Sequence, residues 1–122
     1  MQMSSSRIAP KRGEFWFANL ASLQSSSGAE IRKSRPVLII SNDIVNEKRR
    51  TVLAIPLATS GGKAVANPPI TVSITCAGIK GIAVIDQLRA IDKQRLVKPM
   101  GIVEDSEFKS VIEALSQILQ IT

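Results

Sequence analysis

The chain has 122 residues, enough for one hydrophobic core and too few for two domains. It carries 16 basic and 10 acidic side chains, no histidine and a single cysteine. Without histidine there is no Ser-His-Asp triad and no imidazole ligand for zinc, and one cysteine cannot form an intramolecular disulfide or a thiolate metal cluster.

The positive charge is unevenly distributed. Residues 104–122 hold four acids against one base, so the rest of the chain has 15 bases against 6 acids, a net +9. Such an excess attracts polyanions and binds them in a salt-dependent way. The same charge also fits a basic protein with no role in nucleic-acid binding.

No targeting or membrane segment is expected. The first residues, Met1 to Gly13, are Ser-rich and basic without an apolar stretch, and no apolar run reaches the roughly 18 residues that a membrane span needs. We therefore expect a cytoplasmic protein with no membrane partner. Residues 1–10 are expected to be a flexible tail, and residues 11–122 a single domain.

The first half of the chain predicts three strands. Glu14–Leu20 alternates around aromatic residues, and a Ser-rich loop at 21–34 separates it from an apolar strand at Val37–Ser41. A turn or short helical piece is expected around Asp43–Glu47. The third strand, Thr51–Leu57, ends at a breaker segment, Thr59-Ser60-Gly61-Gly62.

The second half predicts further short strands and one helix. After a loop at 63–69, the expected elements are strands at Ile70–Cys76 and Ile82–Ile85 joined by a turn at Gly78–Gly81, strands at Leu88–Asp92 and Lys98–Val103 joined by a helical turn at Lys93–Leu96, and a final helix. The helix is indicated by an apolar stripe at helical spacing, and Asp105 or Ser106 is expected to cap it. Short antiparallel strands closed by one helix favour a small β-barrel, mainly β with α.

Two single residues attract attention. Arg35 stands before Pro36, which restricts its backbone to extended conformations at the mouth of an apolar strand. Its planar guanidinium is suited to holding a phosphate, although an arginine at a strand end can also simply face solvent. Cys76 lies in an apolar-rich strand and is expected to be a small buried hydrophobe.

Four ordered blocks resemble the MazF/PemK/Kid toxins. They span Lys11 to Leu119 and read Arg12-Gly13-Glu14-Phe15-Trp16, then Arg35-Pro36-Val37-Leu38-Ile39-Ile40-Ser41-Asn42, then Thr59-Ser60-Gly61-Gly62, then Asp86-Gln87-Leu88-Arg89-Ala90-Ile91-Asp92-Lys93. Each block alone is a weak signal, and their order makes the resemblance specific.

The resemblance implies an SH3-like barrel of antiparallel strands of the MazF/Kid/CcdB type with a C-terminal helix, and a homodimer. It also implies a sequence-specific endoribonuclease toxin, an mRNA interferase that needs no metal or other cofactor. Such an enzyme cuts single-stranded mRNA by attack of the 2′-hydroxyl, leaving a 2′,3′-cyclic phosphate and a 5′-hydroxyl. The implied partners are a cognate antitoxin that neutralises the toxin and operator DNA, bound only by the toxin–antitoxin complex.

The resemblance also implies site residues. Arg35 would hold the nonbridging phosphate oxygens, Thr59 would donate a hydrogen bond there, and Asp86 would be the base or a positioning carboxylate. The expected substrate-binding residues are Glu30, Arg32, Lys33, Ser60, Gln87 and Arg89. Structural roles stand beside these: Thr59 and Ser60 as caps of the Gly-Gly turn, and Asp86 as a partner of Arg89.

Three positions differ from the family's pattern. Ala29 stands where Kid-like members have a histidine, Val84 where they have an arginine, and one extra residue before Thr59 leaves open that Ala58 takes the catalytic position. The alternative hypothesis is therefore a catalytically weak or inactive member that acts as a protein- or DNA-binding barrel, like the gyrase poisons. The basic run Lys48-Arg49-Arg50 is expected to be a solvated face rather than an RNA clamp.

Overall fold

The computed structural model describes residues 9–20, 34–58 and 65–121. Within these ranges the chain forms two α-helices, α1 (Asp43–Lys48) and α2 (Asp105–Leu119), and two single 3₁₀ turns, η2 (Ile85–Gln87) and η3 (Lys93–Arg95). The strands are β1 (Glu14–Ala18), β2 (Arg35–Ile39), β3 (Thr51–Ala58), β4 (Thr71–Cys76), β5 (Ile79–Val84), β6 (Arg89–Asp92) and β7 (Leu96–Ile102). No helix in the described parts of the chain is long and apolar enough to cross a membrane.

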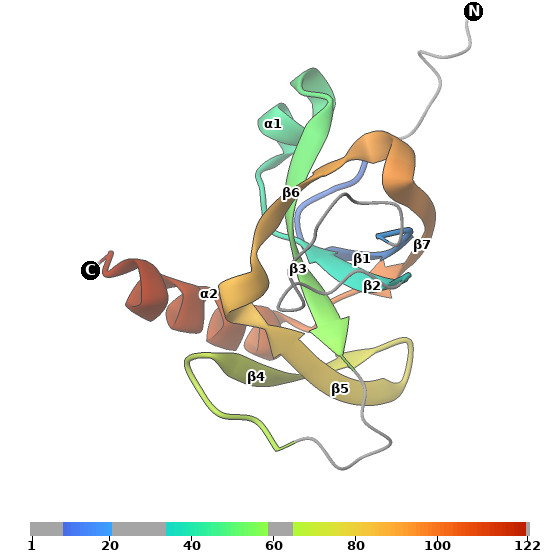
Figure 1. Ribbon diagram of the computed structural model, residues 1–122. Helices are drawn as coiled ribbons and strands as arrows, with labels where there is room; N and C mark the ends of the chain where they lie inside the picture. The colour runs from blue at the N-terminus through green and yellow to red at the C-terminus, as the bar shows by residue number, and fades with distance from the viewer. Residues whose placement is uncertain (1–8, 21–33, 59–64, 122) are drawn as a thin grey trace, which may run out of the picture.

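β3 is the central strand of a seven-stranded antiparallel sheet in the order β4-β5-β3-β2-β1-β7, with β6 also paired to β3 (Figure 1). Its first half, Thr51–Ala54, pairs with β6, and its end, at Leu57 and Ala58, pairs with β5. Because β3 changes partner along its length, the sheet curls into a half-barrel instead of staying flat. The expected antiparallel barrel with a C-terminal helix is confirmed.

Both faces of the central strands are buried: successive side chains point to opposite faces, and each face packs in an apolar core. Val37 and Ile39 of β2 point into a small core with Val52 and Ala54 of β3, while Leu38 points to the opposite face. That opposite face belongs to the larger core, which β4, β5 and α2 cover. A strand buried on both sides explains the continuous apolar run in β2.

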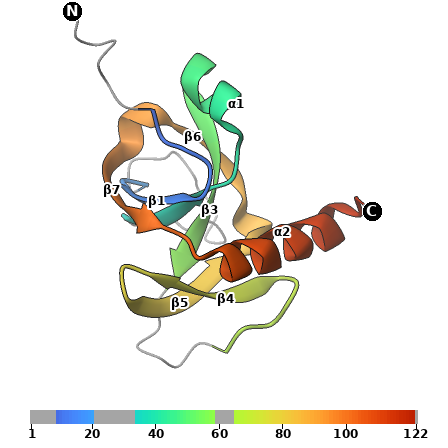
Figure 2. The ribbon, with the colours of Figure 1, turned by 180° about the vertical axis from the view of Figure 1, so that it is seen from behind.

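α2 covers the larger core and lies over the β4–β5 hairpin (Figure 2). Glu107, in its first turn, accepts hydrogen bonds from the backbone N–H of Thr75 at 2.9 Å and from the Thr75 hydroxyl at 3.2 Å. The expected cap was wrong: the N-cap residue is Glu104, and Asp105 and Ser106 already belong to the helix. Ser106 instead donates its hydroxyl to Glu104 at 2.7 Å.

Arg12 ties three elements together. Its backbone N–H donates to the Asp43 carboxylate of α1 at 2.8 Å, and its guanidinium donates to the Ile40 carbonyl just after β2. The same guanidinium lies 4.8 Å from the centre of the Phe108 ring of α2. The first of the four family-like blocks therefore includes a residue whose observed contacts are structural.

Several strands and turns begin at residues other than those expected from the sequence. The turn expected at Gly78–Gly81 is a two-residue turn at Ala77 and Gly78, which both have positive φ, and β5 begins at Ile79. Positive φ at both central positions gives the twist that a tight hairpin requires. β2 begins at Arg35 rather than Val37, so the arginine is itself part of the strand.

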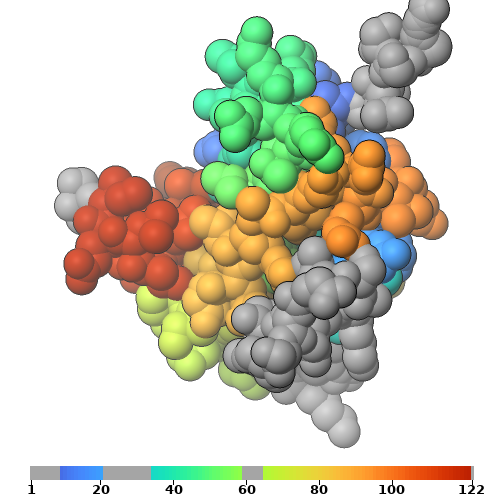
Figure 3. All heavy atoms as spheres, turned by 45° about the horizontal axis from the view of Figure 1, so that its top comes forward, coloured from blue at the N-terminus to red at the C-terminus, as the bar shows by residue number. Residues whose placement is uncertain are grey.

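The segment from β6 through η3 to β7 crosses from one edge of the half-barrel to the other. β6 pairs with β3, whereas β7 pairs with β1. In Figure 3 this segment is the orange band between green α1 and the blue end of β1. The crossing brings the ends of β1 and β2 close to η3.

Candidate active site

Arg35, the first residue of β2, lies at one end of the sheet. Its backbone pairs with Ala18 of β1, and its Nη1 donates a 3.2 Å hydrogen bond to the Leu57 carbonyl of β3. Leu57 is next to the last residue of β3, Ala58, after which Thr59 follows in the sequence. The fold therefore holds the guanidinium beside the point where the third block of the family pattern begins.

One donor of the Arg35 side chain has no partner among the described residues. Its Nε–H is buried, and residues 9–20, 34–58 and 65–121 supply no hydrogen-bond acceptor for it. Leaving such a buried donor unpaired costs about 1–3 kcal/mol, more for a charged group. Arg35 as a whole is only half-buried, and a guanidinium can bind two oxygens of a phosphate at once.

Asp86 and Gln87 lie in η2, directly after β5. η2 packs against β3 and α2. Asp86 is exposed, and among the described residues its carboxylate has no hydrogen bond and no ion pair, so the alternative pairing with Arg89 is not found. A solvent-exposed carboxylate free of structural partners can accept a proton from a substrate hydroxyl.

Arg35 and η2 lie on opposite sides of β3. Leu57 pairs with Ala83 of β5 on one side and accepts the Arg35 hydrogen bond on the other. Adjacent strands are about 4.8 Å apart, so the backbones of β2 and β5 are separated by about 10 Å here. β3 itself fills this distance, and no ion pair joins Arg35 to Asp86 within the described residues.

The remaining expected site residues fall into two groups. Arg89 is the first residue of β6, pairs with Ala54 and is half-buried, as is Gln87. Both already interact with other parts of the chain. The others lie outside the described residues: Glu30, Arg32, Lys33, Thr59 and Ser60. Ala58 ends β3 opposite Ile82, and which of Ala58 and Thr59 has the catalytic position stays open.

Asn19 and Ser34 form a contact that the sequence analysis missed. The Ser34 hydroxyl donates to the Asn19 side-chain oxygen at 3.3 Å, and the Asn19 backbone N–H donates to the Arg95 carbonyl at 2.8 Å. These bonds join the end of β1, the residue before Arg35 and η3. The only signal in the sequence was a pair of small polar residues at the two ends of a long loop.

Two other features lie apart from Arg35. Cys76 is a buried free cysteine, as expected, and burial raises the pKa of its thiol.

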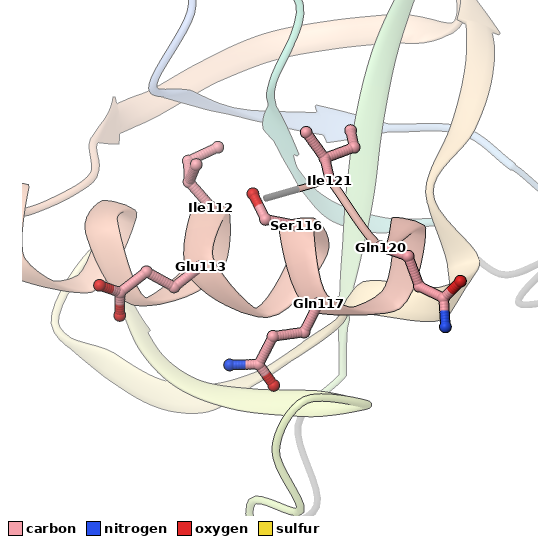
Figure 4. A pocket seen from close by; sticks show the side chains of 6 residues that line it. All are labelled: Ile112, Glu113, Ser116, Gln117, Gln120 and Ile121. Atoms are coloured by element: carbon pink, nitrogen blue, oxygen red, sulfur yellow. The ribbon is translucent and has the colours of Figure 1, made fainter.

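Residues of α2 and the chain just after it line an open hollow of about 770 Å³ (Figure 4). In Figure 4 the side chains of Ile112, Ser116 and Ile121 lie on one side of the helix ribbon, and those of Glu113 and Gln117 on the other. Among the described residues no cluster of acidic or cysteine side chains is suited to a metal ion.

The comparison with protein families identifies the chain's relatives. Residues 11–119 match the family described as the PemK-like, MazF-like toxin of type II toxin-antitoxin systems. The chain belongs to this family. That result confirms the resemblance drawn from the four sequence blocks, because the matched range covers all of them.

Curated relatives of this PemK/MazF-like chain are endoribonucleases. It is 36% identical over 112 residues to Endoribonuclease PemK of Escherichia coli, covering 89% of this chain and 81% of that protein. It is 31% identical over 107 residues to Endoribonuclease EndoA of Bacillus subtilis, covering 86% and 90%. The fold is also shared with MazF from Deinococcus radiodurans, at a TM-score of 0.78 and 20% identity over 94% of this chain and all of that one.

Proposed function

We propose that this PemK/MazF-like chain is an endoribonuclease toxin that cleaves single-stranded mRNA at a short sequence without a metal ion. The observation that carries the proposal is the Arg35 guanidinium, which the fold holds at a strand end through the Leu57 carbonyl, with no acidic partner among the described residues. Family membership and the names of the relatives support the same activity.

The proposed reaction is an internal transfer within the RNA. The 2′-hydroxyl oxygen attacks the adjacent phosphorus and loses its proton to a base, and the bond from phosphorus to the 5′-oxygen breaks. The departing 5′-oxygen takes up a proton, so the products are a 2′,3′-cyclic phosphate and a 5′-hydroxyl. The nucleophile belongs to the substrate, and the enzyme supplies proton transfer and charge stabilisation.

The residues divide these tasks. Arg35 binds the nonbridging oxygens and stabilises the negative charge that grows on them at the pentacoordinate phosphorus. Asp86, across β3, takes the proton of the 2′-hydroxyl or positions that group. Thr59 contributes a further hydrogen bond, and Glu30, Arg32, Lys33, Ser60, Gln87 and Arg89 contact the bases and the neighbouring phosphates.

The family also suggests the partners. A cognate antitoxin neutralises the enzyme, operator DNA is bound only by the toxin–antitoxin complex, and the toxin is a homodimer. The activity belongs in the cytoplasm, where mRNA is translated. Co-expression of an antitoxin with the toxin, followed by co-purification and an RNA cleavage assay, tests the neutralisation directly.

The activity is tested by incubating the protein with a long unstructured RNA in EDTA and mapping the new ends. Cleavage at one short motif with 5′-hydroxyl ends is the expected result. A folded protein that leaves the RNA intact would overturn the proposal and favour the alternative of a binding barrel. A heat-denatured sample and an Arg35→Ala variant prepared in parallel control for contaminating ribonucleases.

A further inference from the structure

Most of the chain's net charge gathers on two neighbouring segments. Residues 47–50 and 89–98 together hold seven bases against two acids, a net +5, while the whole chain has a net +6. Four of these bases form what we call the basic ridge: Lys48, Arg49, Arg50 and Lys93. From the sequence, the first three were expected to be a solvated face rather than an RNA clamp.

The fold joins the two segments into one surface. The Lys93 backbone N–H donates to the Arg50 carbonyl at 2.8 Å, and the Lys93 ammonium lies 3.4 Å from the Glu47 carbonyl. Arg50 also approaches the Asp92 carboxylate at 3.8 Å, an exposed pair that offsets little of the ridge's charge. Figure 3 shows the two segments side by side, the green residues of α1 above the orange band of β6 and η3.

The ridge leads away from both parts of the candidate site. β6 starts two residues after Gln87, and η3 is tied by the Arg95 carbonyl to Asn19, which in turn contacts the residue before Arg35. At about 3.3 Å per residue, the four residues of β6 extend the surface by about 13 Å from η2 towards α1. A strand that leaves the site over β6 therefore meets the ridge next.

We infer that the basic ridge binds the phosphates of single-stranded RNA flanking the cleaved bond. This inference rests on the proposed function, since it takes RNA as the substrate. Lysines and arginines whose charge is not neutralised by acidic neighbours bind a phosphate backbone through charge and counterion release, independently of base sequence. The ridge would thus raise affinity for long RNA and leave the choice of cleavage motif to the site.

A pair of matched double variants tests the ridge. Lys48→Gln with Arg49→Gln removes two exposed charges from it, and Lys80→Gln with Lys109→Gln removes two exposed charges from β5 and α2. The probe is a single-stranded RNA, fully 2′-O-methylated so that a 2′-hydroxyl attack cannot occur. Its dissociation constant is measured over a series of salt concentrations.

The ridge variant should bind the probe about tenfold more weakly than wild type at low salt, with the salt slope reduced by up to about 1.4. The control variant should bind like wild type. With cleavable RNA, the ridge variant should raise KM for a long substrate and leave kcat and the cleavage of a minimal oligonucleotide unchanged. Equal losses in both variants, or no loss in the ridge variant, would overturn the inference. Failure of the proposed function gives a different result, because wild-type protein then cuts no RNA. The binding comparison between the two double variants does not depend on cleavage and still tests the ridge.

Discussion

The Arg35 Nη1 and the Leu57 carbonyl oxygen lie 3.2 Å apart, a hydrogen bond that bends the side chain of β2's first residue over the end of β3. This contact directs the guanidinium by a backbone atom rather than by a carboxylate. The positive charge is therefore not neutralised by an acidic partner among the described residues and stays available to an anion. The consequence is a set of expectations for variants of Arg35.

Arg35→Ala should lower the rate of RNA cleavage by at least about 100-fold, because it removes the main proposed stabiliser of negative charge in the transition state. The free energy of unfolding should change by no more than about 1.5 kcal/mol, since one hydrogen bond is lost. Arg35→Lys keeps the charge but lacks the planar fork, so it should remain well below wild type. Single-turnover cleavage and denaturant unfolding measure both quantities; wild-type cleavage by a folded Arg35→Ala protein would remove Arg35 from the mechanism.

Glu107 should anchor α2 to the sheet. Glu107→Ala should lower the free energy of unfolding by about 1–3 kcal/mol, because the Thr75 backbone and hydroxyl donors lose a charged acceptor. The matched control is Glu113→Ala, because Glu113 is an exposed glutamate of the same helix. This substitution should change the free energy of unfolding by less than about 0.5 kcal/mol. Urea unfolding followed by circular dichroism distinguishes the two variants, and equal effects would contradict an anchoring role.

Asn46 should be among the polar residues most sensitive to substitution. Its side chain is fully buried, donates to the Ser41 carbonyl at 2.9 Å and accepts from the Ser41 hydroxyl. Asn46→Ala leaves these groups without partners and should cost about 2–3 kcal/mol of stability. The matched control is Glu47→Ala, which changes an exposed residue of the same helix, α1. Thermal unfolding compares the two variants. Similar melting temperatures would show that the hydrogen bonds between Asn46 and Ser41 contribute little.

Cys76 should make stability depend on alkaline pH. Burial raises the pKa of its thiol above the ordinary value of 9.0, so the folded state holds the proton more tightly than the unfolded state. This contribution is fully present below pH 9.0 and is lost as the pH rises through the folded-state pKa. The stability difference between wild type and Cys76→Ala should therefore shrink above that pH. A constant difference from neutral to alkaline pH would contradict the expectation.

Sequence patterns predicted the fold well where periodicity and burial agree. The apolar run of β2, the alternation of β4 and the helical stripe of α2 each specify a buried surface, and all three elements are observed. The cap of α2 was missed because the N-cap residue, Glu104, makes no side-chain capping hydrogen bond and is not one of the residue types that usually cap helices. The hairpin turn was missed because Ala77 adopts a positive φ that is unusual for alanine.

The sequence predicted which residue types belong to the candidate site better than it predicted how the strands place them relative to one another. The motif around Arg35 pointed to phosphate chemistry, but its hydrogen bond to Leu57 and the Asn19–Ser34 contact depend on how three strands meet. The ridge shows the same limit. Arg50 and Lys93 are 43 positions apart in the sequence, and the pairing of β3 with β6 brings them together.

The central claim is that the RNA itself supplies the nucleophile while Arg35 stabilises the charge. Once the cleavage motif is mapped, the most direct measurement uses an oligonucleotide of that sequence with a single 2′-deoxy substitution at the nucleotide 5′ to the cut. The account predicts that wild-type protein binds this substrate but does not cleave it, whereas a 2′-deoxy substitution elsewhere in the flanking sequence leaves cleavage intact. Cleavage of the substituted oligonucleotide at the mapped bond would contradict the account, because the attacking oxygen would then have to come from water.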